Sequence, residues 1–481
     1  MEMKKMEIGP RGAAKCALDI GDGSERGEYV NQDYILQTLG RPHRNVSLMY
    51  TYYPYDKEWP ERISVACKDM EIHFQWDYPY DDYFPYGGGL NGNTEGEPFT
   101  YMRDIRRHGQ DVSLTLTIDC SVKEEDLRQI ARELRPFGRM RIRINHECTG
   151  DWFTHNQRYS YQEIGDFFVK FKDIIKEEAP GITVVFCAGG AKDDETGELE
   201  YEKELLGGYK GADVWSMDCY LALHYGWPFD VCEKGGTSFS SYTVDTFYEK
   251  LKRSVERLTY VNDGVEKPFV ISEFNTDGDV TGPKRQGESV RRFLEKVKKE
   301  DDSWFSAVTM YQFRDRGRLG LEIEDPNNSE VGIPQPIMQD YKKFLADPYF
   351  NPTITPQGET KLPVKLRWGG AEDAEGLAIT LALEKAPEFF EVSFAEELNL
   401  MMEINGRWFY KAPETKTIDV MSAFFDEDFT EGREVTLTIF APPASGENDP
   451  SQGEDWDINY YETIHELPQF RIRYESVKDI G

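Results

Sequence analysis

Hydrophobic and polar positions along the chain follow two patterns, which predict two different domains. From about residue 45 to residue 345, short β-rich runs alternate with amphipathic helical segments. The β-rich runs are eight in number: 45–53, 71–78, 111–120, 139–147, 182–190, 212–220, 267–274 and 304–313. Eight strands that are each followed by a helix match a (β/α)8 barrel, and an open doubly wound sheet is the alternative. The strand count, and the lack of a Gly-rich phosphate loop after the first run, favour the barrel.

Four of the helical segments have a clear apolar face. They are residues 123–135, 161–178, 243–258 and 289–300. In the second, one face carries Ile164, Phe167, Phe168, Phe171 and Ile174. Apolar residues at this spacing predict a helix that packs on a sheet.

The pattern changes after Tyr349. Residues 351–363 are rich in Pro, Gly and Thr and are typical of a linker. Beyond them, runs such as GLAITLAL and EVTLTIF alternate with period two between turn residues, which predicts an all-β sandwich. We therefore expect four parts: an N-terminal extension packed on the barrel (1–44), the barrel (45–350), a linker (351–363) and a β-sandwich (364–481).

Composition and charge narrow the class of partner. The formal net charge of −32 would repel nucleic acid and anionic membranes, so neither is expected to bind. Aromatic residues make up 13% of the chain, which indicates either large cores or sites for flat, partly apolar ligands. The seven cysteines contain no CxxC pair, so neither a zinc site nor a disulfide framework is expected.

Charged residues occupy the end of the run RIRINHE (141–147), where a buried strand would be apolar. Alternation places four polar side chains on one face: Arg141, Arg143, Asn145 and Glu147. The other face carries Ile142, Ile144 and His146. We expect the polar face to point into the barrel or its mouth, because the apolar face would meet the surrounding helices. A structural ion pair is the alternative for Arg141, which lies deeper in the strand.

The run KPFVISEF (267–274) ends in a second carboxylate. We expect Phe269, Ile271 and Glu273 to alternate inward, which puts Glu273 at the barrel mouth opposite Glu147. Retaining glycosidases use two carboxylates about 5–5.5 Å apart, one as proton donor and one as nucleophile. Arg143 would stabilise an ionised Glu273. Tyr220, at the end of the run SMDCY, would either donate to that carboxylate or pack as an aromatic ring.

These motifs resemble glycoside hydrolase family 26. RINHECTGDWF is similar to the acid/base motif of that family, KPFVISEFN to its nucleophile strand, and VWSMDCY to its strand with Asp-x-Tyr. The resemblance covers about residues 45–345. It implies a retaining β-glycoside hydrolase of the endo-β-mannanase type, with a β-linked polysaccharide or oligosaccharide as substrate and with no metal or other cofactor.

The same resemblance assigns roles to individual residues. Glu147 would be the general acid/base and Glu273 the nucleophile. The supporting residues would be Arg143, Asn145, His146 and Tyr220. Trp152 would be a platform for a sugar ring. Where the family often ends its eighth strand with Trp, this chain has MYQF (310–313), so Tyr311 or Phe313 would take that place.

Two loops that follow predicted strands, residues 78–93 and 221–230, are rich in aromatic rings with polar residues beside them. Such loops suit sugar binding, because a ring can pack on the apolar face of a sugar while polar side chains bind its hydroxyl groups. We expect Trp76, near the end of the predicted strand 71–78, and His224, Tyr225 and Trp227 of the second loop to line the cleft. Other interpretations stay open: a β-1,3/1,4-glucanase or xylanase of the same clan, or a carbohydrate-binding barrel without catalysis.

The N-terminus MEMKKMEIGPRG lacks the apolar segment of a signal peptide. Secretion after removal of a signal, or a cytoplasmic protein acting on imported oligosaccharides, both fit.

Overall fold

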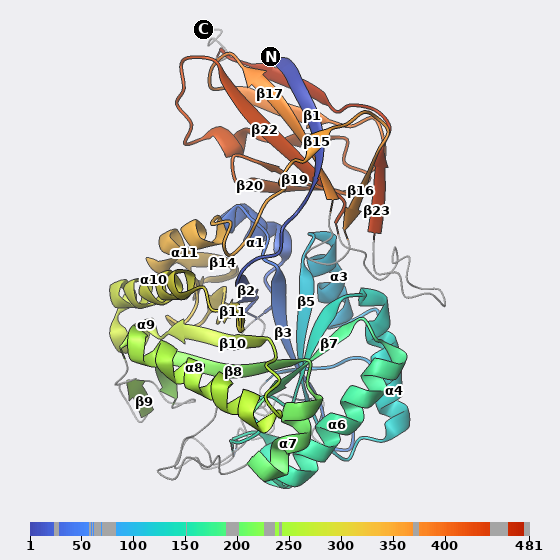
Figure 1. Ribbon diagram of the computed structural model, residues 1–481, viewed down its shortest axis with the longest axis vertical. Helices are drawn as coiled ribbons and strands as arrows, with labels where there is room; N and C mark the ends of the chain where they lie inside the picture. Colours follow the sequence, from blue (N-terminus) through green and yellow to red (C-terminus); the bar gives the residue numbers. More distant parts are fainter. Residues whose placement is uncertain are drawn as a thin grey trace.

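The computed structural model describes residues 1–23, 28–56, 59, 61, 69, 83–150, 152–188, 202–225, 236–239, 243–368, 375–442 and 460–475. Its largest part is a closed barrel of eight parallel strands (Figure 1). The strands are β2 (Ala17–Gly21), β3 (Asn45–Tyr52), β5 (Asp111–Ile118), β6 (Met140–Ile144), β7 (Ile182–Cys187), β8 (Val214–Tyr225), β10 (Phe269–Thr276) and β11 (Phe305–Met310). Each pairs with the next, and β11 pairs with β2 to close the barrel. The predicted (β/α)8 barrel is confirmed.

The first barrel strand differs from the one expected. β2 lies within the segment 1–44, which was expected to be an extension outside the barrel, and its inward side chains alternate with the buried Leu18 and Ile20. β3 pairs directly with β5 over the whole length of both strands. The predicted strand 71–78 therefore has no place between them, and that segment lies outside the described residues. The sequence ALDIG (17–21) is too short to give a strong period-two signal, which is why β2 was missed.

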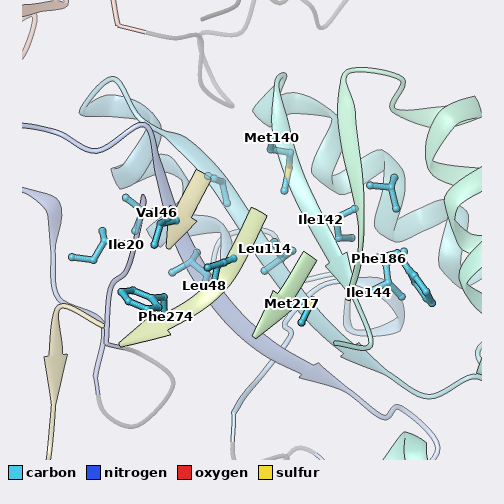
Figure 2. Packing of buried hydrophobic residues seen from close by; sticks show 14 of the residues in the cluster. Ile20, Val46, Leu48, Leu114, Met140, Ile142, Ile144, Phe186, Met217 and Phe274 are labelled. Carbon is cyan, nitrogen blue, oxygen red and sulfur yellow. The ribbon is translucent and has the colours of Figure 1, made fainter. Parts of the chain in front are cut away.

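A helix follows each barrel strand. The helices are α1 (Gln32–Leu39), α3 (Phe99–Arg107), α4 (Glu124–Leu134), α6 (Tyr161–Glu178), α7 (Glu202–Gly211), α8 (Val244–Val261), α10 (Pro283–Glu300) and α11 (Ile337–Leu345). α6 has the predicted bounds because Ser160 and Glu163 form a capping box at its start. Figure 2 shows outward side chains of the barrel, such as Leu48, Leu114 and Ile142, in the buried layer that these helices cover.

Shorter elements complete this part of the chain. They are β4 (Phe84–Pro85), α5 (Thr154–Arg158), β9 (Gly236–Phe239), α9 (Gly278–Thr281), β12 (Arg314–Asp315), β13 (Glu322–Asp325) and β14 (Asn328–Pro334). β12, β13 and β14 form a small sheet, and in the chain they lie between β11 and α11. Among the described residues, no helix combines the length and apolar character needed to cross a membrane.

The C-terminal domain consists of two antiparallel sheets that share one apolar core. The strands of the larger sheet include β15 (Gly358–Glu359), β16 (Val364–Trp368), β17 (Glu375–Leu383), β19 (Leu400–Ile404), β20 (Arg407–Lys411), β22 (Arg433–Phe440) and β23 (Tyr460–Ile464). The smaller sheet contains β18 (Phe389–Ser393), β21 (Thr417–Asp419) and β24 (Gln469–Arg473). The predicted C-terminal sandwich is thus present.

The start of the chain belongs to this sandwich as well. β1 (Glu2–Pro10) lies between β15 and β17 in the larger sheet, so residues 1–44 are not one extension packed on the barrel. The segment 351–363 runs beside β1, with backbone hydrogen bonds from Thr355 and Gln357 to it. The expected linker is therefore part of the sheet edge, because β1 offers that segment a partner that its local sequence does not reveal.

The sandwich packs against segments of the barrel domain that lead into the strands. Trp408 is buried with Leu36, Ile354 and Phe440, and its backbone N–H donates to Gly40 O at 2.7 Å. These segments lie at the amino-terminal ends of the barrel strands. The loops that follow the strands lie at the opposite face of the barrel. In barrels of this kind, that face carries the active site.

Candidate active site

Strand β6 ends at Ile144, and the backbone then turns sharply. Asn145 and Glu147 have φ values of 45° and 49°, in the left-handed region that L residues seldom adopt. The Asn145 side chain holds this turn, because it accepts a hydrogen bond from Ile118 N (2.7 Å) and donates one to Ile118 O (3.0 Å). Asn145 thus binds the end of β5, and the expectation that it points into the mouth was wrong: regular alternation stops with the strand.

His146 takes the place in the mouth that alternation had assigned to Asn145. Its Nε2 lies 3.9 Å from Glu273 Oε1 and 3.4 Å from the Tyr83 hydroxyl. Burial, together with the positive charge of Arg143, lowers the pKa of His146 well below its ordinary value. The ring is therefore neutral near pH 7, and it packs against Phe153 at a centroid distance of 4.7 Å.

Glu273 reaches the barrel interior through an irregularity in β10. Val270, not Ile271, packs in the inner apolar layer, whereas Phe269 and Ile271 face the helices. The pairing of β10 with β8 then shifts between Ile271 and Glu273. This bulge adds a residue and turns Glu273 inward, as bulges beside functional sites often do. The inward position of Glu273 was predicted, but the alternation that was expected to produce it was wrong.

Arg143 joins the strand ends of this half of the barrel. Its Nε donates to Thr115 Oγ1 at 2.8 Å, Nη1 to Asp218 Oδ1 at 2.6 Å and Nη2 to Glu273 Oε1 at 2.7 Å. The other oxygen of Glu273 accepts from the Tyr220 hydroxyl at 2.8 Å. Both oxygens of Glu273 are thereby held as acceptors in a nearly closed environment, where such charge-assisted bonds are strong.

Asp218 is the member of this network to which no role was assigned from the sequence. Its side chain is fully buried beside Arg143. Burial raises the pKa of Asp218; Arg143 opposes this, and the charges of Glu273 and Glu147 raise it further. The pKa of Arg143, which burial alone would lower, is raised by Asp218 and Glu273. The signal was available, because Asp218 and Tyr220 alternate on one face of the run VWSMDCY.

A second polar layer lies deeper in the barrel. Arg141 pairs with Asp19 of β2 at 2.8 Å, and the amide of Asn45 donates to the same carboxylate. Arg141 therefore forms a structural ion pair, which was the alternative interpretation of this residue.

Glu147 lies at the rim of the site, half-buried. Its Oε2 accepts a hydrogen bond from Trp152 Nε1 at 2.7 Å. Trp152, Tyr220 and Tyr311 belong to one apolar cluster together with Met49 and Phe153, and the rings of Tyr220 and Tyr311 meet edge to face at 5.8 Å. The structure brings Glu147, Glu273, Arg143, His146, Tyr220, Trp152 and Tyr311 to the same end of the barrel.

The other predicted cleft residues cannot be placed in this way. Trp76 and Trp227 lie outside the described residues. His224 and Tyr225 belong to the backbone of β8, in the part that pairs with β9, but their side chains are not among those described. Their roles in the cleft stay predictions.

One grouping could in principle hold a metal ion. Among the described residues, atoms of His146, Asp218 and Glu273 lie within 4.8 Å of one another. Arg143 already donates to both carboxylates, so a cationic group is in place between them. The absence of a metal from the chemistry stays a prediction.

His155 gives a prediction about stability. It is completely buried behind Phe153, and neither ring nitrogen has a partner among the described residues. Burial lowers its pKa from 6.5 to about 3, so its contribution to stability is present above pH 6.5 and is lost as the pH falls toward 3. We expect His155→Phe to raise the free energy of unfolding at pH 7 by about 1–3 kcal/mol, because it removes an unsatisfied buried polar group. The loss of stability between pH 7 and pH 4 should also become smaller.

Thermal unfolding at both pH values, followed by circular dichroism, measures both effects. His43→Phe is the matched control. His43 is also buried and its pKa is lowered to about 3, but its Nε2 lies 2.8 Å from the Tyr341 hydroxyl. The control should therefore destabilise the protein at pH 7. A His155→Phe protein that is as destabilised as the control would show that His155 has a partner.

Comparison with known proteins yields similar folds but no family. No protein-family model matches the chain, and no curated protein sequence matches it. Three solved structures illustrate the similarity. A GH26 β-mannanase from Bacteroides ovatus has 13% identity over 71% of this chain and 90% of its own, with a TM-score of 0.41. An endo-β-1,4-mannanase of Cellulomonas fimi has 12% identity over 94% of both chains, with a TM-score of 0.43. A family 39 glycoside hydrolase from Bacteroides cellulosilyticus has 12% identity over 89% of this chain and 81% of its own, also with a TM-score of 0.43. These identities and TM-scores are too low to support an argument about function. The fold is therefore established by the strand pairing described above, and the chemistry is argued from the side chains of this chain.

Proposed function

We propose that the protein is a retaining β-glycoside hydrolase in which Glu273 is the nucleophile and Glu147 the general acid/base. The observation that carries the proposal is the binding of Glu273 from two sides, by Arg143 at 2.7 Å and by Tyr220 at 2.8 Å. A carboxylate whose two oxygens both accept hydrogen bonds is oriented to attack and poorly suited to donate a proton. Glu147, at the rim, is accessible to a leaving group.

In the first step, an oxygen of Glu273 attacks the anomeric carbon while Glu147 gives its proton to the glycosidic oxygen. The bond from the anomeric carbon to that oxygen breaks, and a glycosyl ester of Glu273 forms. The indole N–H of Trp152 can only donate, so Oε2 of Glu147 must accept and the transferable proton belongs on Oε1. The hydrogen bonds from Arg143 and Tyr220 to Glu273 become weaker in this step, because the ester carries no negative charge.

In the second step, Glu147 accepts a proton from water, and the water oxygen attacks the anomeric carbon. The ester bond breaks, and Glu273 leaves as a carboxylate that Arg143 and Tyr220 again stabilise. Two inversions at one carbon give net retention. Asp218, buried behind Arg143, keeps the guanidinium in place for both steps.

For the substrate we propose a β-linked polysaccharide or oligosaccharide, with mannan first and β-glucan or β-xylan next. A panel of these glycans should be digested and the products analysed by mass spectrometry. Proton NMR of the first product formed should show the β-anomer. Release of the α-anomer first would contradict the retaining mechanism, and no release from any glycan or aryl β-glycoside would contradict the enzyme.

Trp152→Phe separates two roles of this side chain. Phenylalanine keeps a flat ring for a sugar but cannot donate to Glu147. We expect kcat to fall by about 10- to 100-fold, the size of one hydrogen bond to a charged group, while KM changes by less than about threefold. Steady-state kinetics on one glycan measures both. If KM rises and kcat is unchanged, Trp152 acts as a platform alone.

A further inference from the structure

Glu147 lies on a tight turn that follows strand β6. The turn spans residues 147–150, and Gly150 N donates to Glu147 O at 2.9 Å. The regular pairing of β6 with its neighbour β5 ends at Ile144, so the sheet does not hold Glu147 directly. The position of its carboxyl group therefore depends on the contacts that hold the turn.

The side chain of Asn156, on the short helix α5, holds this turn at both ends. Its Nδ2 donates to Glu147 O at 3.1 Å and to Gly150 O at 2.6 Å. The amide group has two N–H donors, and these two carbonyl oxygens use both of them. If the amide were rotated by 180°, its oxygen would face two other acceptors, so only one orientation of the side chain fits.

Helix α5 is itself anchored at both ends. Beyond its last residues, Asp119 at the end of β5 accepts from the Tyr159 hydroxyl at 2.6 Å and from Arg158 Nη1 at 3.1 Å. At its start, Phe153 is buried in the apolar cluster of the site. Asn156 therefore extends from a helix that is fixed to the barrel, and its side chain can keep the turn in place.

The same turn brings Trp152 to Glu147. A Cβ atom at residue 150 would overlap the indole ring of Trp152, so the ring passes over the backbone where glycine leaves room. This path places Trp152 Nε1 at 2.7 Å from Glu147 Oε2. A shift of Gly150 would therefore displace the carboxyl group and its hydrogen-bond donor together.

We propose that Asn156 is a positioning residue that places the carboxyl group of Glu147 for proton transfer. This inference rests on the proposed glycosidase function and deepens it. Asn156 acts through the backbone of Glu147 and Gly150, and it exchanges no proton with the substrate. Proton transfer requires that donor and acceptor lie within hydrogen-bond reach, so it is the step that loses most when the turn moves.

Asn156→Ala should therefore lower catalysis selectively. Aryl β-glycosides with poor leaving groups need a proton, so their kcat/KM, which reports the first step, should fall by about 10- to 100-fold. A dinitrophenyl glycoside needs no proton, and its kcat/KM should change by less than about threefold. A loosened barrel or a smaller active fraction would lower both values by the same factor. The ratio of the two values thus separates positioning from a structural role.

Asn262→Ala is the matched control. Asn262 Nδ2 also donates to a backbone carbonyl oxygen, that of Val265 at 2.6 Å, but it follows α8 in the segment that leads into β10. The ratio of kcat/KM values for the two substrates should equal that of the wild type. If Asn156→Ala does not fold, Asn156→Asp keeps the size of the side chain, and near pH 7 its carboxylate has no N–H to donate. It should change the ratio in the same direction.

The outcomes separate the two proposals. Equal losses on both substrates, or unchanged kinetics of the Asn156 variant, would overturn the positioning role while the glycosidase stands. A wild type that hydrolyses no glycoside would overturn both.

Discussion

Glu273→Ala should abolish glycan hydrolysis, with kcat lowered by on the order of 10⁴-fold or more. The variant lacks the group that forms the covalent intermediate, and water cannot use the hydrogen bonds from Arg143 and Tyr220 in the same way. Sodium azide should restore part of the turnover of an aryl β-glycoside with a good leaving group. The small anion enters the space left by the side chain and attacks from the same face, so the product is an α-glycosyl azide.

Glu273→Gln is the matched control, because it removes the charge but keeps the space filled. It should be equally inactive, and azide should not rescue it. Product configuration is determined by NMR and the rates by release of the aryl group. Near wild-type hydrolysis by Glu273→Ala would end the assignment of the nucleophile, and a β-azide would mean that another carboxylate still forms the intermediate.

The barrel could be predicted from the sequence because the hydrophobic pattern that indicates it extends over many residues. Apolar faces such as that of 161–178, and runs such as 111–120, each repeat a period several times, and the helices and strands occur where expected. β2 and β1 were missed for the opposite reason. Each is defined by its partners, β3 and β11 for the one and β15 and β17 for the other, and long-range pairing leaves little mark on a short segment.

The candidate site shows where alternation along a strand is an insufficient guide. Arg143 and Tyr220 lie within regular strands, and both point inward as predicted. Beyond Ile144 the left-handed turn exchanges the expected positions of Asn145 and His146, and in β10 the bulge restores Glu273 to the interior. Both irregularities occur at strand ends, where the backbone departs from regular geometry to place a functional group. Such departures depend on neighbouring strands and cannot be deduced from one segment alone.

The sandwich and the candidate site lie at opposite ends of the barrel. The contacts of the sandwich with the barrel, through Trp408 and the end of α1, involve the segments that lead into the strands. The site occupies the other end. The chain connects the sandwich to the barrel domain twice, since it leaves the sandwich after β1 and returns to it at β15. Among the described residues, the sandwich adds no side chain to the polar network around Arg143.

Glu147→Ala should have an effect that depends on the leaving group. Glycans and aryl glycosides with poor leaving groups need a proton in the first step, so their kcat/KM should fall by about 10²- to 10⁴-fold. A dinitrophenyl glycoside needs no proton, so formation of the ester on Glu273 should stay fast and a burst of phenolate should appear. Azide should then attack that ester and give a β-glycosyl azide, opposite in configuration to the product of Glu273→Ala.

The two variants therefore assign the two carboxylates without reference to the structure. Pre-steady-state release of phenolate measures the burst, and NMR gives the configuration of the azide. Equal losses on good and poor leaving groups would show that Glu147 does not protonate the leaving oxygen. Glu147 is fixed by an unusual φ of 49° and by Trp152, rather than by a strand, and this pair of measurements tests its assignment directly.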